Sequence, residues 1–359
     1  WSSDVCSSDL DLAVLDRMNQ CRSQPLAYSV TGKDFAVTGK KDKEPKGKDA
    51  KDPKEDDEKS RDMREGQMGT LPPCELDAEA SMACEDHAKY LTKWPEQHMK
   101  WPEAHEENPA LEGFSPRGMR AGMRSVIVFA NGDRGVEFAK ESVDGWIGTV
   151  YHRFPLLEHN INRFGYSYVF DNGWSVAVLD MGSLEEPYDP STAPKFVCWP
   201  PVGMKEVPLR FHGNEMPNPL DDQPENERDL KRVGYPVSLQ LQKEYATQVG
   251  DCDIAMFEVR AGGKAPTRNV FIDGTDPRDA ADLKAYKDRR KEAVPLYKHT
   301  PKNPLLKRME EREVVFGIPK AVLEPSRTYQ VEVKLGGQGP GLLFIWEFTT
   351  GQQAEGLKF

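Results

Sequence analysis

Residues 143–182 read VDGWIGTVYHRFPLLEHNINRFGYSYVFDNGWSVAVLDMG and decide the fold of the first half of the chain. Apolar side chains recur at spacings of three and four from Val136 to Val150, which predicts an amphipathic helix that ends just before Tyr151. Apolar and polar residues then alternate on both sides of the DNG sequence at 171–173. Because alternation around such a turn is typical of a β-hairpin, we expect a helix followed by an antiparallel sheet.

Two more helices are predicted upstream of this stretch. The first lies within residues 11–30 and ends near Pro25, because apolar side chains recur there at a spacing of three: Leu12, Leu15, Met18 and Cys21. The second spans most of residues 72–91, PPCELDAEASMACEDHAKYL, with Asp77 in its first turn, where the helix dipole favours an anion. Helices packed on an antiparallel sheet make an α+β domain, which we place at residues 11–184.

Two segments are not expected to belong to a folded domain. Residues 40–66 hold 20 charged residues in 27, ten basic and ten acidic. This composition cannot bury enough apolar surface to offset chain entropy, so we predict a disordered insertion. Residues 1–10, WSSDVCSSDL, resemble the translation of a sequencing adapter joined to a metagenomic gene fragment, and we expect them to be an artefact. A signal peptide upstream of the fragment would then have been lost.

The second half of the chain has short β-type runs in place of helical periodicity. A Pro-rich linker is predicted at 185–195, a sandwich of about seven strands at 196–350 and a tail at 351–359. A polar excursion at about 275–311 interrupts the sandwich. The runs that predict strands are residues 196–199, 207–211, 237–241, 252–259, 268–272, 312–318, 328–335 and 342–350.

Composition and charge exclude several classes of function. The formal net charge of -11 and the pI near 5.3 argue against nucleic acid or an anionic membrane as a partner, because both require a positive surface. No run approaches the roughly 18 apolar residues that a transmembrane segment needs. The sequence also lacks a Gly-rich phosphate loop, a Cys-x-x-Cys pair, an HExxH motif and a nucleophile elbow.

Four histidines of the first domain are the remaining candidates for chemistry. His87 lies on the apolar face of its predicted helix, which favours a buried structural role, whereas His98 lies in a Trp- and Pro-rich loop and is expected to be exposed. His105 opens the loop sequence HEEN, and His152 directly follows an amphipathic helix. Two neutral imidazoles in one cleft can bind a divalent metal such as zinc, with carboxylates or water as further ligands.

The order of these motifs resembles the CAP superfamily, also called the SCP domain, which includes cysteine-rich secretory proteins, antigen 5 and plant pathogenesis-related proteins. The resemblance is carried by a helix with Asn19 and Arg22, then LDAEASMACEDHAKYL, a His loop, VDGWIGTVYHRFPLL and a strand that begins FGYSY. It implies an α-β-α sandwich with a cleft that holds two histidines and two glutamates. His152 matches the second family histidine, and His105 is our choice for the first, with His98 as its competitor.

The acidic half of that tetrad departs from the family pattern. Arg124 and Ser125 stand where the family has the last two residues of Gly-Glu-Asn, and Thr149 stands where many members have a glutamate. A cation at Arg124 would repel a divalent metal. We therefore expect a polar cleft with weak or no metal affinity, formed by these residues: His105, Arg124, Ser125, Thr149 and His152. Glu106 and Glu107 are the candidates to replace the missing carboxylate from the loop.

The second domain resembles the end of bacterial Ig-like modules. The similarity lies in LEPSRTYQVEVKL followed by WEFTTG, and it implies a spacer or adhesive unit in an exported protein. Cys198 and Cys252 lie on predicted strands and are candidates for a disulfide, with two buried free thiols as the alternative. The pairing of Cys21, Cys74 and Cys84 stays open.

Together, these features predict an exported bacterial protein, either extracellular or in the cell envelope. Its predicted function is the non-catalytic binding of a small apolar or peptide-like ligand, or of a cell-envelope component, with the sandwich as a spacer. One alternative is a peptidase-like hydrolase that uses His105 and His152 with a metal-bound or His-activated water and Glu107 as base. A second alternative is a structural envelope protein that makes no use of the cleft.

Overall fold

The computed structural model describes residues 7–23, 71–184, 196–211, 215–241, 252–259, 270–272, 284, 287–300, 314–336 and 341–352. The predicted charged insertion at 40–66, the linker at 185–195 and most of the adapter-like start and of the tail lie outside these ranges. Within them, no helix combines the length and the apolar character needed to cross a membrane.

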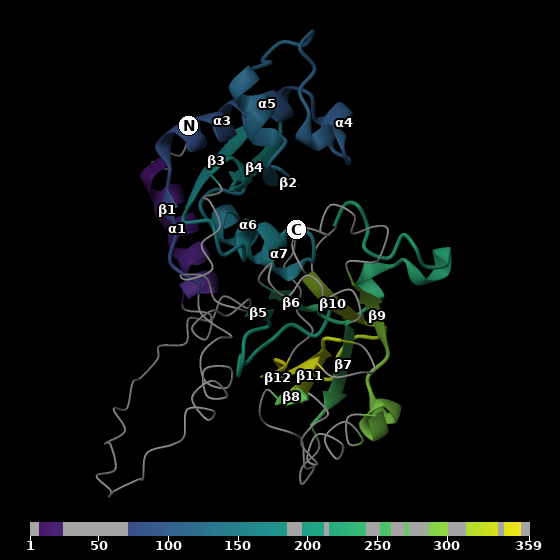
Figure 1. The fold of residues 1–359 in the computed structure, drawn as a ribbon. Helices are drawn as coiled ribbons and strands as arrows, with labels where there is room; N and C mark the ends of the chain where they lie inside the picture. The colour runs from purple at the N-terminus through teal and green to yellow at the C-terminus, as the bar shows by residue number, and fades with distance from the viewer. Residues whose placement is uncertain are drawn as a thin grey trace, which may run out of the picture.

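The first domain is built around one four-stranded sheet with the strand order β1-β3-β4-β2 (Figure 1). The short β1 runs parallel to β3, whereas β4 is antiparallel to both of its neighbours. Asn172 and Gly173 form the turn between β3 and β4, both with positive φ, which confirms the predicted hairpin. The bounds are β1 (Glu75–Leu76), β2 (Ser125–Asn131), β3 (Arg163–Asp171) and β4 (Trp174–Asp180).

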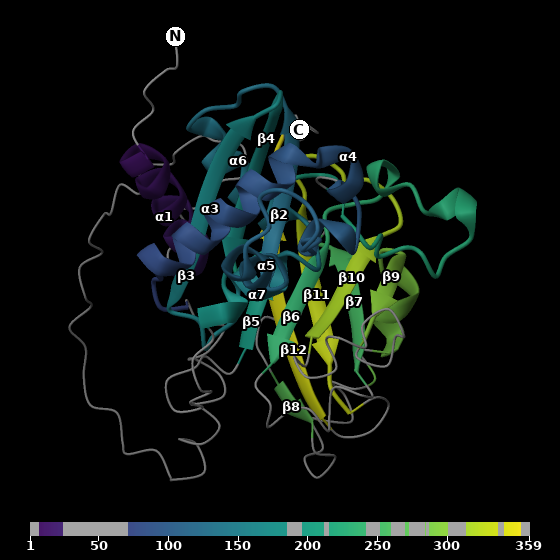
Figure 2. The same cartoon turned by 90° about the horizontal axis from the view of Figure 1, so that it is seen from above.

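Helices cover both faces of this sheet, because successive side chains of β4 point to opposite sides. Val176 and Val178 pack against α3 and α5, and Ala177 and Leu179 belong to the core that α1 and α6 complete. Figures 1 and 2 show this three-layer arrangement, which is the predicted α-β-α sandwich. The helix bounds are α1 (Ser7–Ser23), α3 (Ala78–Lys93), α4 (Pro95–His98), η1 (Glu103–His105), α5 (Pro116–Gly122), α6 (Glu137–Gly148) and α7 (Arg153–Leu156).

Helix α1 buries only part of the predicted apolar face. The buried apolar residues are Val14, Met18 and Cys21, and Leu15 is partly buried, whereas Leu12 is 63% exposed. Spacings of four and three keep side chains on one side of a helix, but a strict spacing of three rotates away from it. The prediction for Leu12 is therefore wrong. The helix also begins at Ser7, inside the stretch that resembles an adapter.

The described residues of the second domain form two four-stranded sheets, with the strand orders β5-β6-β10-β9 and β7-β11-β12-β8. Val237 and Val315 of the first sheet share a core with Met256, Val331 and Trp346 of the second. This confirms the predicted all-β region, although its likeness to Ig modules stays a prediction. The bounds are β5 (Phe196–Trp199), β6 (Val237–Leu241), β7 (Asp253–Glu258), β8 (Val270–Ile272), β9 (Leu296–His299), β10 (Val314–Pro319), β11 (Thr328–Lys334) and β12 (Gly341–Thr349).

Two parts of this sandwich differ from the sequence prediction. Residues 207–211 form isolated bridges at Val207 and Arg210 in place of a strand, since Pro208 has no N–H to donate to a ladder. Strand β9 lies inside the predicted polar excursion at 275–311. There, Tyr297 is directly opposite Ile318 of β10.

The predicted disulfide between Cys198 and Cys252 is not formed, and Cys198 is a buried thiol. Cys198 belongs to β5 of one sheet, whereas Cys252 directly precedes β7 of the other. Burial raises the pKa of the Cys198 thiol to about 12, so the reactive thiolate is scarce. In the first domain, Cys21, Cys74 and Cys84 are also free and buried.

The two domains share an apolar interface instead of being held apart. Val150 and Phe154, which flank the start of α7, are fully buried in one cluster with Phe211, Leu220 and Phe316 of the second domain. The rings of Phe154 and Phe316 lie 5.9 Å apart between centroids. The stretch VYHRF at residues 150–154, which belongs to the motif VDGWIGTVYHRFPLL, thus contributes side chains to the core of the second domain.

A buried arginine adds polar contacts to the same interface. The guanidinium of Arg153 donates to the carbonyl of Pro236 at 3.0 Å and to the hydroxyl of Ser238 at 3.1 Å. It also lies over the ring of Tyr235, with 5.4 Å to the centroid, and donates to the carbonyl of Ile147 in its own domain. Arg153 therefore links the end of α6 to β6.

Replacing Phe154 with alanine is expected to destabilise both domains together, by about 3–5 kcal/mol, because the cavity would lie in a core that they share. Calorimetry should show one unfolding transition that moves to lower temperature. The matched control is Phe170→Ala, whose ring is 44% exposed on β3 and whose loss should change stability little. Two separate transitions in the wild type, of which F154A moves only one, would contradict a shared core.

Candidate functional site

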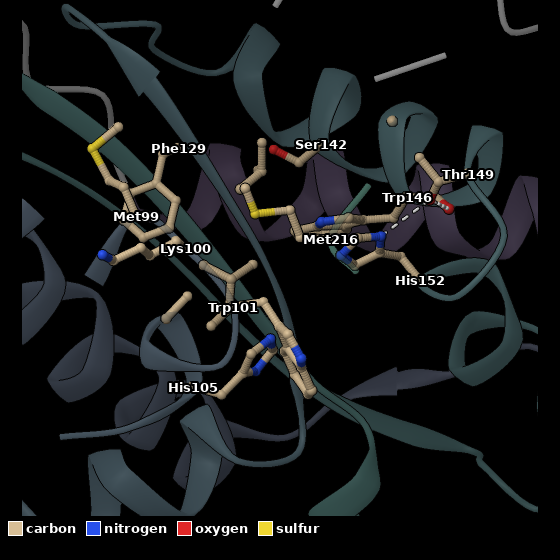
Figure 3. Close-up of a pocket in the computed structure, with 14 residues that line it drawn as sticks. Met99, Lys100, Trp101, His105, Phe129, Ser142, Trp146, Thr149, His152 and Met216 are labelled. Atoms are coloured by element: carbon tan, nitrogen blue, oxygen red, sulfur yellow. Dashed lines mark hydrogen bonds between the residues drawn. The ribbon is translucent and has the colours of Figure 1, made fainter. Parts of the chain in front are cut away.

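A cavity of about 260 Å³ lies between β2, α6 and the segment that follows α4 (Figure 3). We call it the cleft. Most of its side chains are apolar, and one of them, Met216, comes from the second domain. The cleft is therefore an apolar pocket to which both domains contribute. Its walls are formed by residues 99–101, 104, 105, 127–129, 142, 145, 146, 149, 152 and 216.

His105 and His152, which lie 47 positions apart in the sequence, both line the cleft. His105 is the last residue of the short turn η1, which follows Pro102. Its ring lies beside that of Trp101, with 5.2 Å between ring centroids. His152 follows α6 and precedes α7, beside Trp146 in Figure 3. The two histidines predicted for the site are therefore brought to one pocket.

Hydrogen bonds define the tautomer of His105. Its Nδ1 lies 2.8 Å from the carbonyl oxygen of Gly122. A carbonyl oxygen only accepts, so Nδ1 carries the proton and Nε2 of the neutral ring does not. An unprotonated Nε2 can act as a hydrogen-bond acceptor, a base or a metal ligand.

Trp146 supplies a buried donor to the wall of the cleft. The residue is 3% exposed and its indole Nε1 has no hydrogen-bond partner among the described residues. Buried polar groups in proteins are nearly always hydrogen-bonded. The indole ring of Trp146 lines the cleft, so this N–H is a donor beside the cleft, covered from it in the present side-chain position.

Glu107 does not line the cleft. Its Oε1 lies 2.9 Å from Nδ1 of His87 and its Oε2 accepts from the backbone N–H of Ser115 at 2.8 Å. Both His87 and Glu107 are buried, and Nε2 of His87 is 3.0 Å from the carbonyl of Ala104. His87 thus has the structural role that its helix position predicts, and the geometry does not support Glu107 as a base in the cleft.

His98 is also held away from the cleft. It is 6% exposed, so the expectation that it is exposed is wrong. Its Nδ1 lies 2.7 Å from the carbonyl of Glu103, and its Nε2 lies 3.0 Å from the hydroxyl of Tyr90. Both ring nitrogens therefore have partners inside the domain, which leaves His105 as the histidine of this loop that faces the cleft.

Two other residues predicted for the cleft lie outside its walls. Arg124 is exposed, and its guanidinium donates to the carbonyl of Gly182. The hydroxyl of Ser125 donates to the carbonyl of Gly122 at 3.0 Å. Because the Arg124 side chain is exposed and does not line the cleft, the predicted repulsion of a metal does not operate at this position.

The donor set of the cleft does not fit a zinc site. Zinc sites in proteins use three or four protein ligands, and the described residues of the cleft walls offer two imidazoles and no carboxylate or thiolate. Throughout the described ranges there is no group of three or more His, Cys, Asp or Glu side chains arranged to hold a metal ion.

Sequence reasoning missed Glu215, the acid that does contact a cleft histidine. Its Oε1 lies 3.1 Å from Nδ1 of His152, and its side chain is fully buried. Glu215 lies 63 residues further along the chain, in the second domain, within a stretch that matches no motif. No sequence signal pairs the two residues.

Comparison with known protein families identifies the first domain. The family described as "CAP: Cysteine-rich secretory protein family" matches residues 15–181. This part of the chain is a CAP domain. The match begins in α1, includes both cleft histidines and ends just after β4, so Glu215 and Met216 lie beyond it. No curated protein matches the chain.

We expect the protein to retain no stoichiometric zinc after dialysis, because two imidazoles alone hold zinc weakly. Elemental analysis should give less than one zinc per chain, and added zinc should leave the melting temperature of the wild type unchanged. The control is the double variant His105→Ala/His152→Ala. One zinc per chain in the wild type, lost in the double variant, would contradict this expectation.

Proposed function

We propose that the CAP domain binds a small ligand with an apolar body and at least one hydrogen-bond acceptor, and that it does so without catalysis. The observation that carries this proposal is an apolar wall that includes the indole of Trp146, whose buried N–H has no hydrogen-bond partner among the described residues. Leaving a buried donor unpaired costs about 1–3 kcal/mol, which an acceptor on the ligand would recover when the indole turns toward it. A peptide-like molecule supplies such acceptors as carbonyl groups.

The size of the cleft favours a small ligand. Its volume of about 260 Å³ is slightly below the roughly 300–1,000 Å³ of sites for drug-sized molecules. Ile127, Phe129 and Met216 provide apolar surface for the body of the ligand. A short part of a peptide or a small component of the cell envelope has a suitable size and polarity.

Binding is favoured over catalysis because no activated nucleophile lies among the described residues that line the cleft. Ser142 is the one serine among them, and its hydroxyl donates to the carbonyl of Phe138 at 2.5 Å. A serine nucleophile instead donates to a base. The hydroxyl of Thr149 likewise donates to a carbonyl, that of Trp146, at 2.9 Å.

Export to the cell envelope or the extracellular space is part of the same proposal. It rests on the resemblance to CAP and bacterial Ig-like proteins, and the same resemblance favours a bacterial source. A structural role in the envelope is the alternative if the cleft binds nothing. Recovery of the natural start of the gene would test export, because the absence of a signal peptide there would refute it.

Replacing Trp146 with phenylalanine is expected to weaken binding by about two- to tenfold, since it removes one hydrogen bond and keeps an aromatic wall. N-Methylbenzamide is a suitable probe because it combines an apolar ring with an amide, and its affinity can be measured by NMR titration. The matched control is Trp94→Phe, whose indole N–H donates to the carbonyl of Glu112 outside the cleft. Equal affinity of W146F and wild type would count against the proposal.

The contact between His152 and Glu215 favours one second candidate function, a hydrolase in which His152 takes a proton from water. Under the binding proposal, a panel of peptide and ester substrates should show no turnover above that of the His105→Ala/His152→Ala double variant. Turnover by the wild type that the double variant loses would instead support the hydrolase.

A further inference from the structure

The carboxylate of Glu215 reaches the first domain at the junction of α6 and α7. Its Oε2 accepts from the backbone N–H of Val150 at 2.8 Å, and its Oε1 accepts from those of Tyr151 at 2.5 Å and His152 at 3.2 Å. Oε1 is also 3.1 Å from the ring Nδ1 of His152. The fully buried carboxylate is thus satisfied by one loop of the CAP domain.

These contacts determine the tautomer of His152. An ionised carboxylate only accepts, so the ring Nδ1 must donate to Glu215. The second neighbour of Nδ1 is the hydroxyl of Thr149 at 3.1 Å, whose own proton goes to the carbonyl of Trp146. Thr149 therefore accepts as well. With Nδ1 protonated, Nε2 of the neutral ring is left as an acceptor.

We propose that Glu215 is a positioning residue through which the second domain holds His152 in the Nδ1–H tautomer, so that the cleft recognises a ligand N–H at Nε2. The proposal rests on the binding function of the cleft and names its ligand class. The sandwich is then part of the site and more than a spacer.

A secondary amide matches the groups that the cleft presents. The indole N–H of Trp146 becomes a donor for an amide carbonyl when the ring turns toward the cleft, and Nε2 of His152 is an acceptor for an amide N–H. Met216, the next residue after Glu215, lies in the cleft wall. The segment that orients the histidine therefore also shapes the apolar space for the ligand.

Nitrogen-15 NMR of the full chain tests the positioning role without any ligand. At a pH where imidazole is neutral, His152 of the wild type should show a protonated Nδ1 and an unprotonated Nε2. In Glu215→Ala the population should shift toward the Nε2–H tautomer, and Glu215→Gln should restore Nδ1–H, because an amide oxygen also accepts. A purely structural role would not produce this pattern.

Two controls belong to this experiment. His105 donates from Nδ1 to Gly122 in its own domain, so its signals should not change in E215A. Glu227→Ala removes another carboxylate of the second domain, one that accepts from the hydroxyl of Tyr297, and should leave His152 unchanged. Two results would overturn the proposal. One is an Nε2–H tautomer of His152 in the wild type, which can be tested even if E215A fails to fold. The other is an unchanged tautomer of His152 in folded E215A.

Two probes test the ligand class. N-Methylbenzamide and methyl benzoate have nearly the same shape, but the ester lacks the N–H. The wild type should prefer the amide by about two- to tenfold, the worth of one hydrogen bond, and E215A should lose this preference. Equal affinities in the wild type would refute amide recognition. If neither probe binds while the tautomer changes as expected, the binding function fails and the positioning role of Glu215 stands.

Discussion

A single buried carboxylate, that of Glu215, holds the loop on which the rest of the cleft depends. Three consecutive backbone N–H groups at 150–152 and one imidazole converge on it. A buried charge is tolerated only when it is fully hydrogen-bonded, and these four donors meet that condition. Separation of the domains would leave the carboxylate and the loop without partners. The position of His152 is therefore tied to the presence of the second domain.

Buried arginines organise the surrounding backbone in a similar way. Arg22 of α1 donates to the carbonyls of Leu156 and Ile161, both at 2.6 Å, and so fixes the stretch between α7 and β3. Arg17 forms a two-pronged ion pair with Asp144 of α6, at 2.7 and 3.0 Å. Because guanidinium groups offer several donors in fixed directions, each of them can hold irregular backbone in place. The segments before and after the His152 loop are thus held from α1, and the loop itself is held from the second domain.

The sequence predicted the regular elements well, because their patterns are local. The hairpin around 171–173 and the helix before Tyr151 follow from periodicity and turn chemistry alone. Predictions that depended on side-chain direction were less accurate. Leu12 fits a spacing of three but faces solvent, and Arg124 fits a family position but points away from the cleft. Neither direction is encoded in the spacing of residues along the chain.

What the sequence by itself determined was the α-β-α domain, the β-rich second half and the pairing of His105 with His152 in one cleft. These follow from periodicity and from a motif order that spans a single domain. Only the tertiary structure decided that Glu107 binds His87, that Nε1 of Trp146 has no partner among the described residues and that Glu215 orients His152. The physical reason is that Glu107 and His87 lie 20 positions apart within one domain, and Glu215 and His152 lie 63 apart across the domain interface. Hydrogen-bond partners at such a distance are selected by packing, which no local pattern records.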